Sequence, residues 1–142
     1  MAGIDQGMVS KILNATLPTG TAGIPGTWTA LSASAMKLRL NSTSSTAAAA
    51  GTQITGTGYT AGGTAFGTAS TASSAGSSVT CPAGSAISWT NSSGGAWSIQ
   101  SFDITDNAAV RCWFGDWNGA PVSVANGNTF TVAVGAITVG LA

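Results

Sequence analysis

The sequence predicts a mainly β fold: an antiparallel β-sandwich or jelly-roll-like domain with one short N-terminal helix and a long excursion rich in Ser, Ala, Gly and Thr. Two observations carry this prediction. From residue 78 onward, short apolar runs are separated by Gly, Pro, Asn and Asp at intervals of about 8–12 residues, which is typical of sandwiches and barrels. Only one segment, near the N-terminus, has the spacing of an amphipathic helix.

The predicted helix covers residues 5–17. Met8 and Ile12 lie about one helical turn apart in it, so their side chains share a face. Pro18 ends the segment because proline cannot continue a helix. An isolated helix of this length is marginally stable. We therefore expect Met8 and Ile12 to dock on the rest of the fold or on a neighbouring subunit.

Residues 35–43 predict a half-buried strand. Leu38 and Leu40 alternate with Lys37 and Arg39, so that one face of the strand is apolar and the other is charged. This alternation predicts that the two leucines contribute to the core.

A long excursion follows over residues 42–78. It consists mainly of Ser, Thr, Ala and Gly, and its apolar anchors are Ile54, Tyr59 and Phe66. We expect one strand in it, around residues 64–70. Loops of this length are unusual in compact domains, so we expect this arm to be mobile or to be ordered by contact with a partner.

Residues 78–142 form the predicted β-rich core. The apolar runs that predict its strands are 77–84, 86–90, 96–105, 108–117, 120–127 and 128–142. Asn118-Gly119 and Asn126-Gly127 predict hairpin turns, because both residue types tolerate a positive φ. A chain of 142 residues fits a single domain over residues 1–142.

Charge is scarce in this chain. Charged residues make up 6% of it, and the net charge is zero, whereas an average soluble protein is about 25% charged. No basic stripe is present to bind phosphates, so we expect no nucleic-acid partner. No long apolar run, basic amphipathic helix or signal peptide is evident, so we expect no membrane contact and synthesis in a cytoplasm. A surface with so few charges favours assembly with copies of itself.

Residues that could carry chemistry are few. The chain has no histidine and no glutamate, so a triad with a histidine base cannot form. Asp103 and Asp106 could form the carboxylate pair of a glycosidase, but the stretch SFDITDNA favours a strand that runs into a turn. No calcium loop, zinc motif or phosphate-binding loop is evident. We therefore expect no enzymatic activity, no cofactor and no metal.

The two cysteines, Cys81 and Cys112, fit no metal motif. We interpret them as unpaired, small apolar residues. A disulfide between neighbouring strands, formed after release from the cell, is the alternative.

The stretch RCWFGDW, residues 111–117, concentrates charge and indole rings. In one continuous strand, Trp113 and Trp117 would share a face about 13 Å apart, as a glycan platform requires. Packing in a core or a subunit interface is the favoured interpretation, because tryptophans of small β domains are usually used in that way. Arg111 is expected to lie on Trp113 or to pair with Asp116. Trp28 and Tyr59 are further candidate contact residues.

The order of the elements over most of the chain, together with two motifs, resembles a known family: a helix over DQGMVSKILNATL, a strand over MKLRLNST, a glycine-rich middle segment and a β-rich tail. The middle segment, residues 51–59, is a glycine-rich element that ends in G-Y. The tail has the pattern G-x-W-x-G-A-P-V-x-V-x-x-G-x-T-F-x-V over residues 115–132, followed by GAITVGL over residues 135–141. The matching positions are Gly51, Ile54, Gly56, Gly58, Tyr59, Gly115, Pro121, Val122, Val124, Gly127, Phe130, Val132 and Gly135 to Leu141. In this pattern the chain resembles small virion structural proteins of tailed bacteriophages of actinobacteria, the head-decoration and tail-fibre-like proteins. Gln53 and Ala61 stand where an acid and an arginine are expected, so a salt bridge between those positions is not available.

The resemblance implies a β-sandwich-like fold and a structural role in a virion, without catalysis. We expect a capsid decoration protein that stabilises the head as a homo-oligomer, a trimer, on the major capsid protein. A tail fibre or tip protein that binds host glycan through Trp113 and Trp117 is the alternative within the virion. A free carbohydrate-binding module is the alternative of another class.

Overall fold

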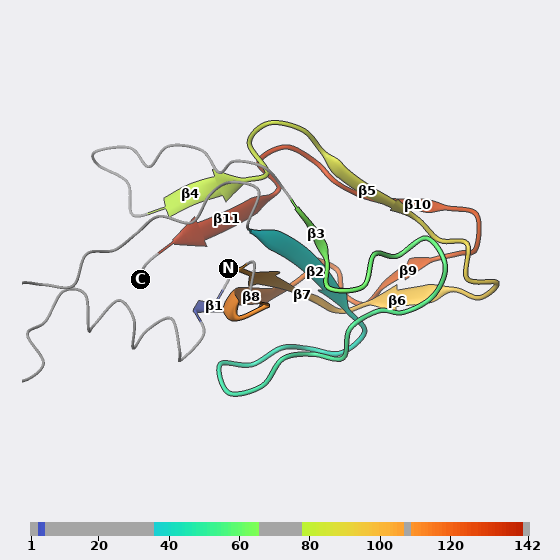
Figure 1. Cartoon of the computed structure of the whole chain (residues 1–142), viewed down its shortest axis with the longest axis horizontal. Coiled ribbons are helices and arrows are strands. Elements are labelled where there is room, and N and C mark those ends of the chain that lie inside the picture. Colours follow the sequence, from blue (N-terminus) through green and yellow to red (C-terminus); the bar gives the residue numbers. More distant parts are fainter. Residues whose placement is uncertain (1–2, 5–35, 66–77, 107–108, 141–142) are drawn as a thin grey trace, which may run out of the picture.

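The computed structural model describes residues 3–4, 36–65, 78–106 and 109–140 (Figure 1). The strands in these ranges are β1 (Gly3–Ile4), β2 (Lys37–Asn41), β3 (Thr64–Ala65), β4 (Ser78–Cys81), β5 (Ile87–Thr90), β6 (Trp97–Ile99), β7 (Ser101–Thr105), β8 (Arg111–Asp116), β9 (Val122–Val124), β10 (Thr129–Val132) and β11 (Ile137–Gly140). Every strand pairing is antiparallel, and the described ranges contain no helix. The mainly β, antiparallel prediction is confirmed. The helix predicted over residues 5–17 lies outside the described residues.

The strands from residue 78 onward form one long, interrupted ribbon of two antiparallel arms. The first arm contains β4 to β7 (residues 78–105), and the second arm contains β8 to β11 (residues 111–140). β4 pairs with β11, β5 with β10, β6 with β9 and β7 with β8, so that each pair is nested inside the one before it. In Figure 1 the ribbon runs from β4–β11 to β5–β10, turns at the far end of the molecule and returns through β6–β9. The ribbon therefore doubles back over itself. This brings β5 opposite the sheet that contains β7.

The second arm turns at regular intervals. In each of its three turns an amide donates to the carbonyl three residues earlier: Ala120 to Trp117 at 3.1 Å, Asn128 to Ala125 at 3.0 Å and Ala136 to Ala133 at 3.1 Å. The third residue of each turn is a glycine with positive φ, namely Gly119, Gly127 and Gly135, at 76°, 87° and 73°. The same strand-and-turn unit therefore recurs with a period of eight residues.

These turns correct the prediction of hairpins at Asn118-Gly119 and Asn126-Gly127. The strands on either side of each turn do not pair with each other, because β8 pairs with β7 and β1, β9 with β6, and β10 with β5. Both turns are corners within one arm. The two-residue hairpin turn favoured by Asn-Gly needs a positive φ at both central residues, and here only the glycines have one. A positive φ at the third position alone is the signature of a type II turn.

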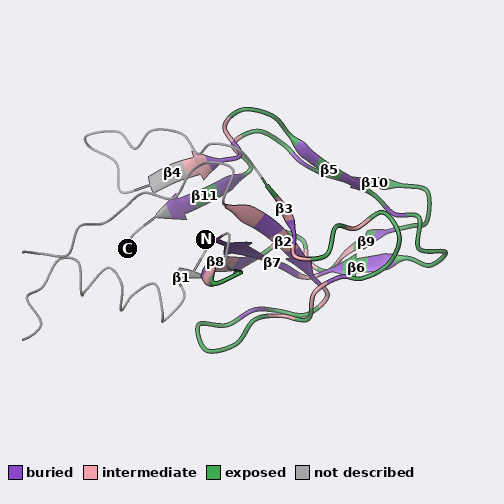
Figure 2. Ribbon diagram, in the orientation of Figure 1, coloured by how far each residue is buried: buried purple, intermediate pink, exposed green. Residues whose placement is uncertain are grey.

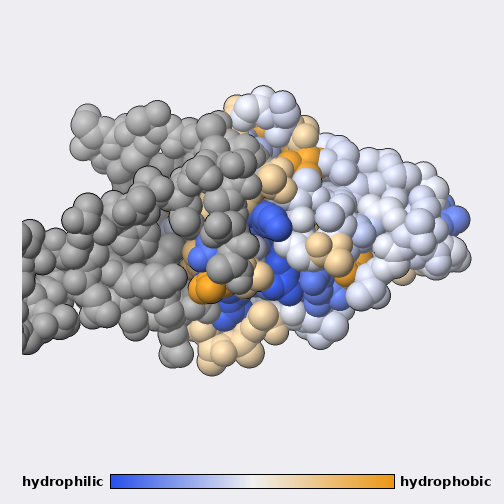
Figure 3. Space-filling model, in the orientation of Figure 1, coloured by the Kyte–Doolittle hydropathy of each residue, from blue (hydrophilic) through white to orange (hydrophobic). Residues whose placement is uncertain are grey.

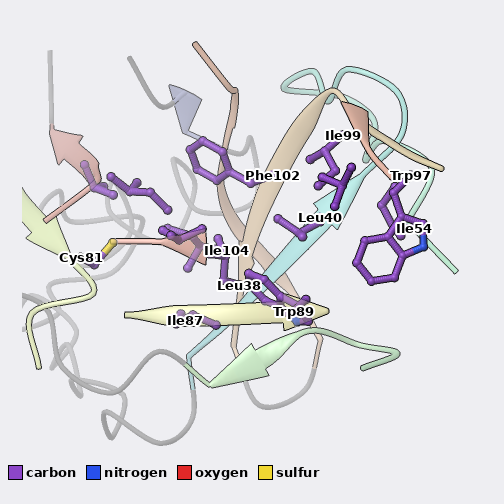
Figure 4. Packing of buried hydrophobic residues seen from close by; sticks show 14 residues of the cluster. Leu38, Leu40, Ile54, Cys81, Ile87, Trp89, Trp97, Ile99, Phe102 and Ile104 are labelled. Carbon is purple, nitrogen blue, oxygen red and sulfur yellow. The ribbon is translucent and has the colours of Figure 1, made fainter. Parts of the chain in front are cut away.

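The core lies between β5 and the five-stranded sheet, whose order is β1-β8-β7-β2-β3. Leu38 and Leu40 of β2 are fully buried, and Lys37 and Arg39, which alternate with them, are half-buried, which confirms the predicted alternation. Trp89 of β5 is 3% exposed and packs in the same cluster. Figure 4 shows Leu38 and Leu40 on β2 facing β5. Burial of these side chains supplies the main favourable term for the fold.

The central strand β7 is buried on both faces (Figure 2). Phe102 and Ile104 point into the core, whereas Ser101, Asp103 and Thr105 point to the opposite face. The predicted strand 96–105 is divided at Gln100 into β6 and β7. The Gln100 amide donates to Asn41 O at 2.8 Å, and the Gln100 carbonyl accepts from Trp117 N at 3.1 Å. At Gln100 the first arm therefore stops pairing with β9 and begins to pair with β2.

The predicted excursion is anchored in its described part, residues 42–65. Ile54 is buried in the core, and the Tyr59 ring lies against Trp89 and Trp97, with ring centroids 6.3 and 6.2 Å away. The Tyr59 hydroxyl accepts hydrogen bonds from Leu40 N at 2.9 Å and from Gln53 Nε2 at 3.1 Å. Two of the three predicted anchors therefore fix this segment. Phe66, the third, lies outside the described residues.

Candidate functional site

The strongest candidate site is a buried group of polar side chains beside β7, which we call the Asp103 cluster: Asn41, Ser45, Ser101, Asp103 and Arg111. Asp103 is 0% exposed. Its Oδ1 accepts a hydrogen bond from Ser45 Oγ at 2.7 Å and its Oδ2 accepts one from Asn41 Nδ2 at 3.0 Å. Asn41 lies on the neighbouring strand β2, and Ser45 lies in the loop that follows β2. The carboxylate therefore joins two strands to a loop.

Ser101 completes the hydrogen-bond network of the cluster. Its hydroxyl lies 3.2 Å from Asn41 Nδ2 and donates to Thr43 O at 2.7 Å. Ser45 Oγ accepts from Gly51 N at 2.8 Å. The loop over residues 42–51 is thus tied to β7 at both of its ends.

A β-bulge brings Arg111 into the cluster. Ile104 pairs with Trp113 and Thr105 pairs with Arg111, so Cys112 is the extra residue of β8. The extra residue turns Arg111 to the face that carries Phe114 and Asp103. The Arg111 guanidinium lies 5.1 Å from the centroid of the Phe114 ring, and its Nη1 lies 3.8 Å from Asp103 Oδ1.

Arg111 also holds the loop. Its guanidinium donates to Ala49 O at 2.6 Å and to Ala47 O at 3.2 Å. The expected stacking of Arg111 on Trp113 and its expected pairing with Asp116 are both wrong. The bulge reverses which side of β8 Arg111 occupies, and Asp116 lies at the far end of the strand, where its Oδ2 accepts from Ser44 Oγ at 3.0 Å.

The Asp103 cluster connects β2, β7 and the loop over residues 42–51, and its carboxylate is not accessible for a reaction. Both oxygens of the Asp103 carboxylate are occupied by protein donors and the residue is closed to solvent. Asp106, the expected partner in a carboxylate pair, lies in the turn after β7. There its Oδ1 accepts from Val110 N at 2.8 Å. The turn interpretation therefore holds for Asp106, whereas Asp103 is a mid-strand residue with its own network.

Trp117 packs inward. Its ring centroid lies 4.8 Å from that of Phe102 and 5.4 Å from that of Phe130. Trp113 is also partly buried against the core cluster. Neither indole is a free, flat platform of the kind that stacks on a sugar ring. Three other candidate contact residues, Trp28, Met8 and Ile12, lie outside the described residues.

Both cysteines are buried and unbridged. Burial raises the pKa of the Cys81 thiol from 9.0 to about 11. A thiol with a raised pKa carries little thiolate at neutral pH and is a poor nucleophile.

Neither a metal centre nor a membrane span is found in the part of the chain that the structure describes. No three His, Cys, Asp or Glu side chains gather there in a way that would hold a metal ion. No helix in those ranges is long and apolar enough to cross a membrane.

Charge is segregated in this molecule. The charged residues of the described ranges are Lys37, Arg39, Asp103, Asp106, Arg111 and Asp116, and all of them belong to β2, β7 and β8 or to the turn between β7 and β8. Residues 78–102 and 117–140, which form the rest of the ribbon, contain no charged residue. Figure 3 shows the end of the molecule formed by β5–β10 and β6–β9 in mostly pale colours, neither strongly hydrophilic nor strongly hydrophobic.

Hydroxyl side chains replace charges on this ribbon. Ser88 Oγ lies 2.9 Å from Thr131 Oγ1, and Thr90 Oγ1 lies 2.9 Å from Thr129 Oγ1, on the exposed side of β5–β10. The ribbon therefore presents polar groups whose hydrogen bonds are already made between its own strands.

No protein-family model, curated protein or solved structure matches this chain.

The sequence did not identify Asn41, Ser45 and Ser101 as the partners of Asp103. Period-two alternation gave no signal for this group, because Arg111 has the same parity as Trp113, and Asp103 has the same parity as Trp97 and Ile99 in the predicted strands. Ser45 carried no signal either, since it lies in a run of similar small residues.

Proposed function

We propose that this chain is a non-enzymatic structural protein of a tailed bacteriophage virion, a capsid decoration protein made in the host cytoplasm and assembled on the head. The observation that carries the proposal is the charge-free ribbon over residues 78–102 and 117–140. The buried centres of protein interfaces are depleted of charged residues. A wide uncharged face can be covered by other subunits without leaving a charge unpaired.

The arrangement of the ribbon supports the same proposal. The nested pairing from β4–β11 inward to β7–β8 is the order in which a jelly roll winds, and jelly rolls occur in viral capsid proteins and lectins. We propose a jelly-roll-like sandwich on this basis. Because one fold serves many functions, the charge distribution is the stronger support.

The Asp103 cluster supports a structural role as well. It uses a carboxylate and a guanidinium to fasten the loop over residues 42–51, and it leaves neither group facing solvent for a substrate. We propose that the ribbon contacts copies of the same chain in a trimer and the major capsid protein beneath. At about 25 cal/mol per Å² of apolar area, even modest patches add cohesion when they are repeated by symmetry.

Binding to undecorated capsids of the phage that encodes the chain tests this proposal. Purified protein is mixed with capsids and bound protein is measured after sedimentation, with saturable binding expected. Thr90→Lys with Thr131→Lys places two charges on the exposed side of β5–β10 and is expected to abolish binding. Ala50→Lys, an equally exposed position in the loop beside the charged sheet, is the matched control and is expected to bind as the natural chain does.

Other outcomes of this experiment would change the proposal. Absence of saturable binding by the natural chain would overturn the head assignment. Few copies per particle, found on the tail, would favour the tail fibre or tip alternative. A glycan-array signal that Trp117→Ala removes without unfolding the protein would favour a carbohydrate-binding module. The inward packing of Trp117 against Phe102 and Phe130 argues against this last outcome.

A further inference from the structure

Both Asn-Gly pairs of the chain lie at exposed corners of the second arm. Asn118 and Gly119 are exposed between β8 and β9, and Asn126 and Gly127 are exposed between β9 and β10. Glycine has no Cβ, so the backbone nitrogen of a glycine can approach the side-chain amide carbon of the asparagine before it. The two pairs are equivalent in sequence and in turn type, but their hydrogen bonding differs.

At Asn118 the reacting groups make no hydrogen bond to the part of the chain that the structure describes. Gly119 N has no hydrogen-bond partner among the described residues, and no heavy atom outside residues 118–120 lies within 4 Å of the position that a Cβ on Gly119 would occupy. The turn is closed by a different amide, Ala120 N, which donates to Trp117 O. The Gly119 nitrogen can therefore move toward the Asn118 side chain without breaking a hydrogen bond of its own.

At Asn126 both reacting groups are held. Gly127 N donates to Asn91 O at 2.7 Å, and Asn126 Oδ1 accepts a hydrogen bond from Gly94 N at 2.9 Å. Asn91 is itself fully buried and fixed by its side-chain amide, which donates to Val124 O at 2.8 Å. Reaction at Asn126 requires that the hydrogen bond of Gly127 N be broken and that the side chain leave the position in which Gly94 N holds it.

We propose that Asn118 is a site of spontaneous deamidation and that the fold protects Asn126 from the same reaction. Gly119 N attacks Asn118 Cγ, the Cγ–Nδ2 bond breaks, and the nitrogen leaves as ammonia with the proton lost by Gly119 N. The product is a cyclic imide. Water then opens the imide at either carbonyl, giving aspartate or isoaspartate, with no oxidation or reduction.

The reaction changes the molecule in two ways. It places a negative charge on residues 117–140, which otherwise carry none. In the isoaspartate product it also adds one carbon to the backbone path inside the turn that Ala120 N and Trp117 O close. The proposal concerns the chain itself and holds whether or not the chain decorates a capsid.

Peptide mapping by mass spectrometry tests the proposal. The folded chain is incubated at mildly alkaline pH, and the amide-to-acid conversion at each asparagine is followed with time. We expect Asn118 to convert faster than Asn126 by roughly tenfold or more, since the hydrogen bond of Gly127 N must open and the Asn126 side chain must leave its place before reaction. In concentrated urea the two rates should become equal, because the protection belongs to the fold. Asn118→Ser should remove the faster acidic product and leave the slower one.

Two results would overturn the proposal. One is equal or faster conversion of Asn126 in the folded chain. The other is an Asn118 amide that persists in the folded chain while both asparagines convert in urea, which would show that the corner at Asn118 is protected as well.

Discussion

Asp103 fixes the position of the loop over residues 42–51 through the hydrogen bonds of its two carboxylate oxygens. Asp103→Asn keeps the shape of the side chain but replaces one acceptor oxygen by a donor, so Ser45 or Asn41 loses its partner in a buried place. We expect the free energy of unfolding to fall by about 1–3 kcal/mol. Urea unfolding followed by tryptophan fluorescence measures it.

The matched control for this change is Asp116→Asn. Asp116 is exposed and its side chain accepts one hydrogen bond, from Ser44. Substitutions at such surface positions usually change stability by no more than about 0.5 kcal/mol. Equal losses in the two variants would show that the Asp103 cluster does not stabilise the fold more than a surface contact does.

The Cys81 thiol makes the free energy of unfolding depend on pH in the alkaline range. Burial raises the pKa of its thiol from 9.0 to about 11, so the folded state retains the proton that the unfolded state releases. The free energy of unfolding should therefore be independent of this thiol below pH 9.0 and should fall as the pH rises toward about 11.

Urea midpoints measured across this pH range, for the natural chain and for Cys81→Ala, isolate the contribution of the thiol. We expect the loss of stability with rising pH to be smaller in the variant, since the other titrating groups are common to both chains. Parallel pH profiles would contradict the account of Cys81.

At the residue scale, the sequence predicted which side chains are buried better than it predicted which polar groups meet. Leu38 and Leu40 follow from the alternation of one strand, which is local information. The predicted partners of Arg111 were wrong because the side of β8 on which Arg111 lies depends on the bulge at Cys112. The residues around Cys112 contain no sequence signal that predicts a bulge. For this reason, contacts that depend on the pairing of distant strands could not be predicted from the sequence.

At the scale of elements, the eight-residue repeat of the second arm depends on glycines at its corners. Gly127 has a φ of 87°, and open space surrounds the position of a Cβ there. Gly127→Ala should therefore destabilise the fold through the backbone alone, by about 1 kcal/mol. Thermal or urea unfolding of the two chains gives this difference.

Gly95→Ala is the control for Gly127→Ala. Gly95 also has open space around it, but its φ is not positive. Alanine at such a position leaves stability unchanged or raises it slightly, because it restricts the unfolded chain. A loss at position 95 as large as that at position 127 would contradict the role assigned to the corner.

The elements themselves were largely predictable, and their partners were not. Each predicted run from 77–84 to 128–142 contains at least one observed strand, because period-two alternation and turn residues are local signals. The nested pairing, such as Ile137 with Cys81, joins residues far apart in the sequence. The Asn-Gly corners suggested hairpins instead, since turn chemistry indicates that the chain bends but not which strand it meets afterwards.

At the scale of the whole molecule, the distribution of charge says more about which surface other subunits could cover than the number of charges does. The scarcity of charge in the sequence predicted assembly, but it did not show that the described charges gather around β2, β7 and β8. That arrangement needs the fold, because β2 is far from β7 and β8 in the sequence and is brought beside β7 only in the sheet. It leaves one continuous ribbon without charge, and we propose that this ribbon is the part of the molecule that other subunits cover.

Imaging of intact virions at a resolution that traces strands tests this central claim most directly. The account predicts that the chain occupies regular positions on the head lattice, as trimers, with the ribbon of residues 78–102 and 117–140 buried against neighbouring subunits. The charged sheet around β2, β7 and β8 should remain outside those contacts. Density for the chain that is confined to the tail, or a head-bound chain with its uncharged ribbon facing solvent, would contradict it.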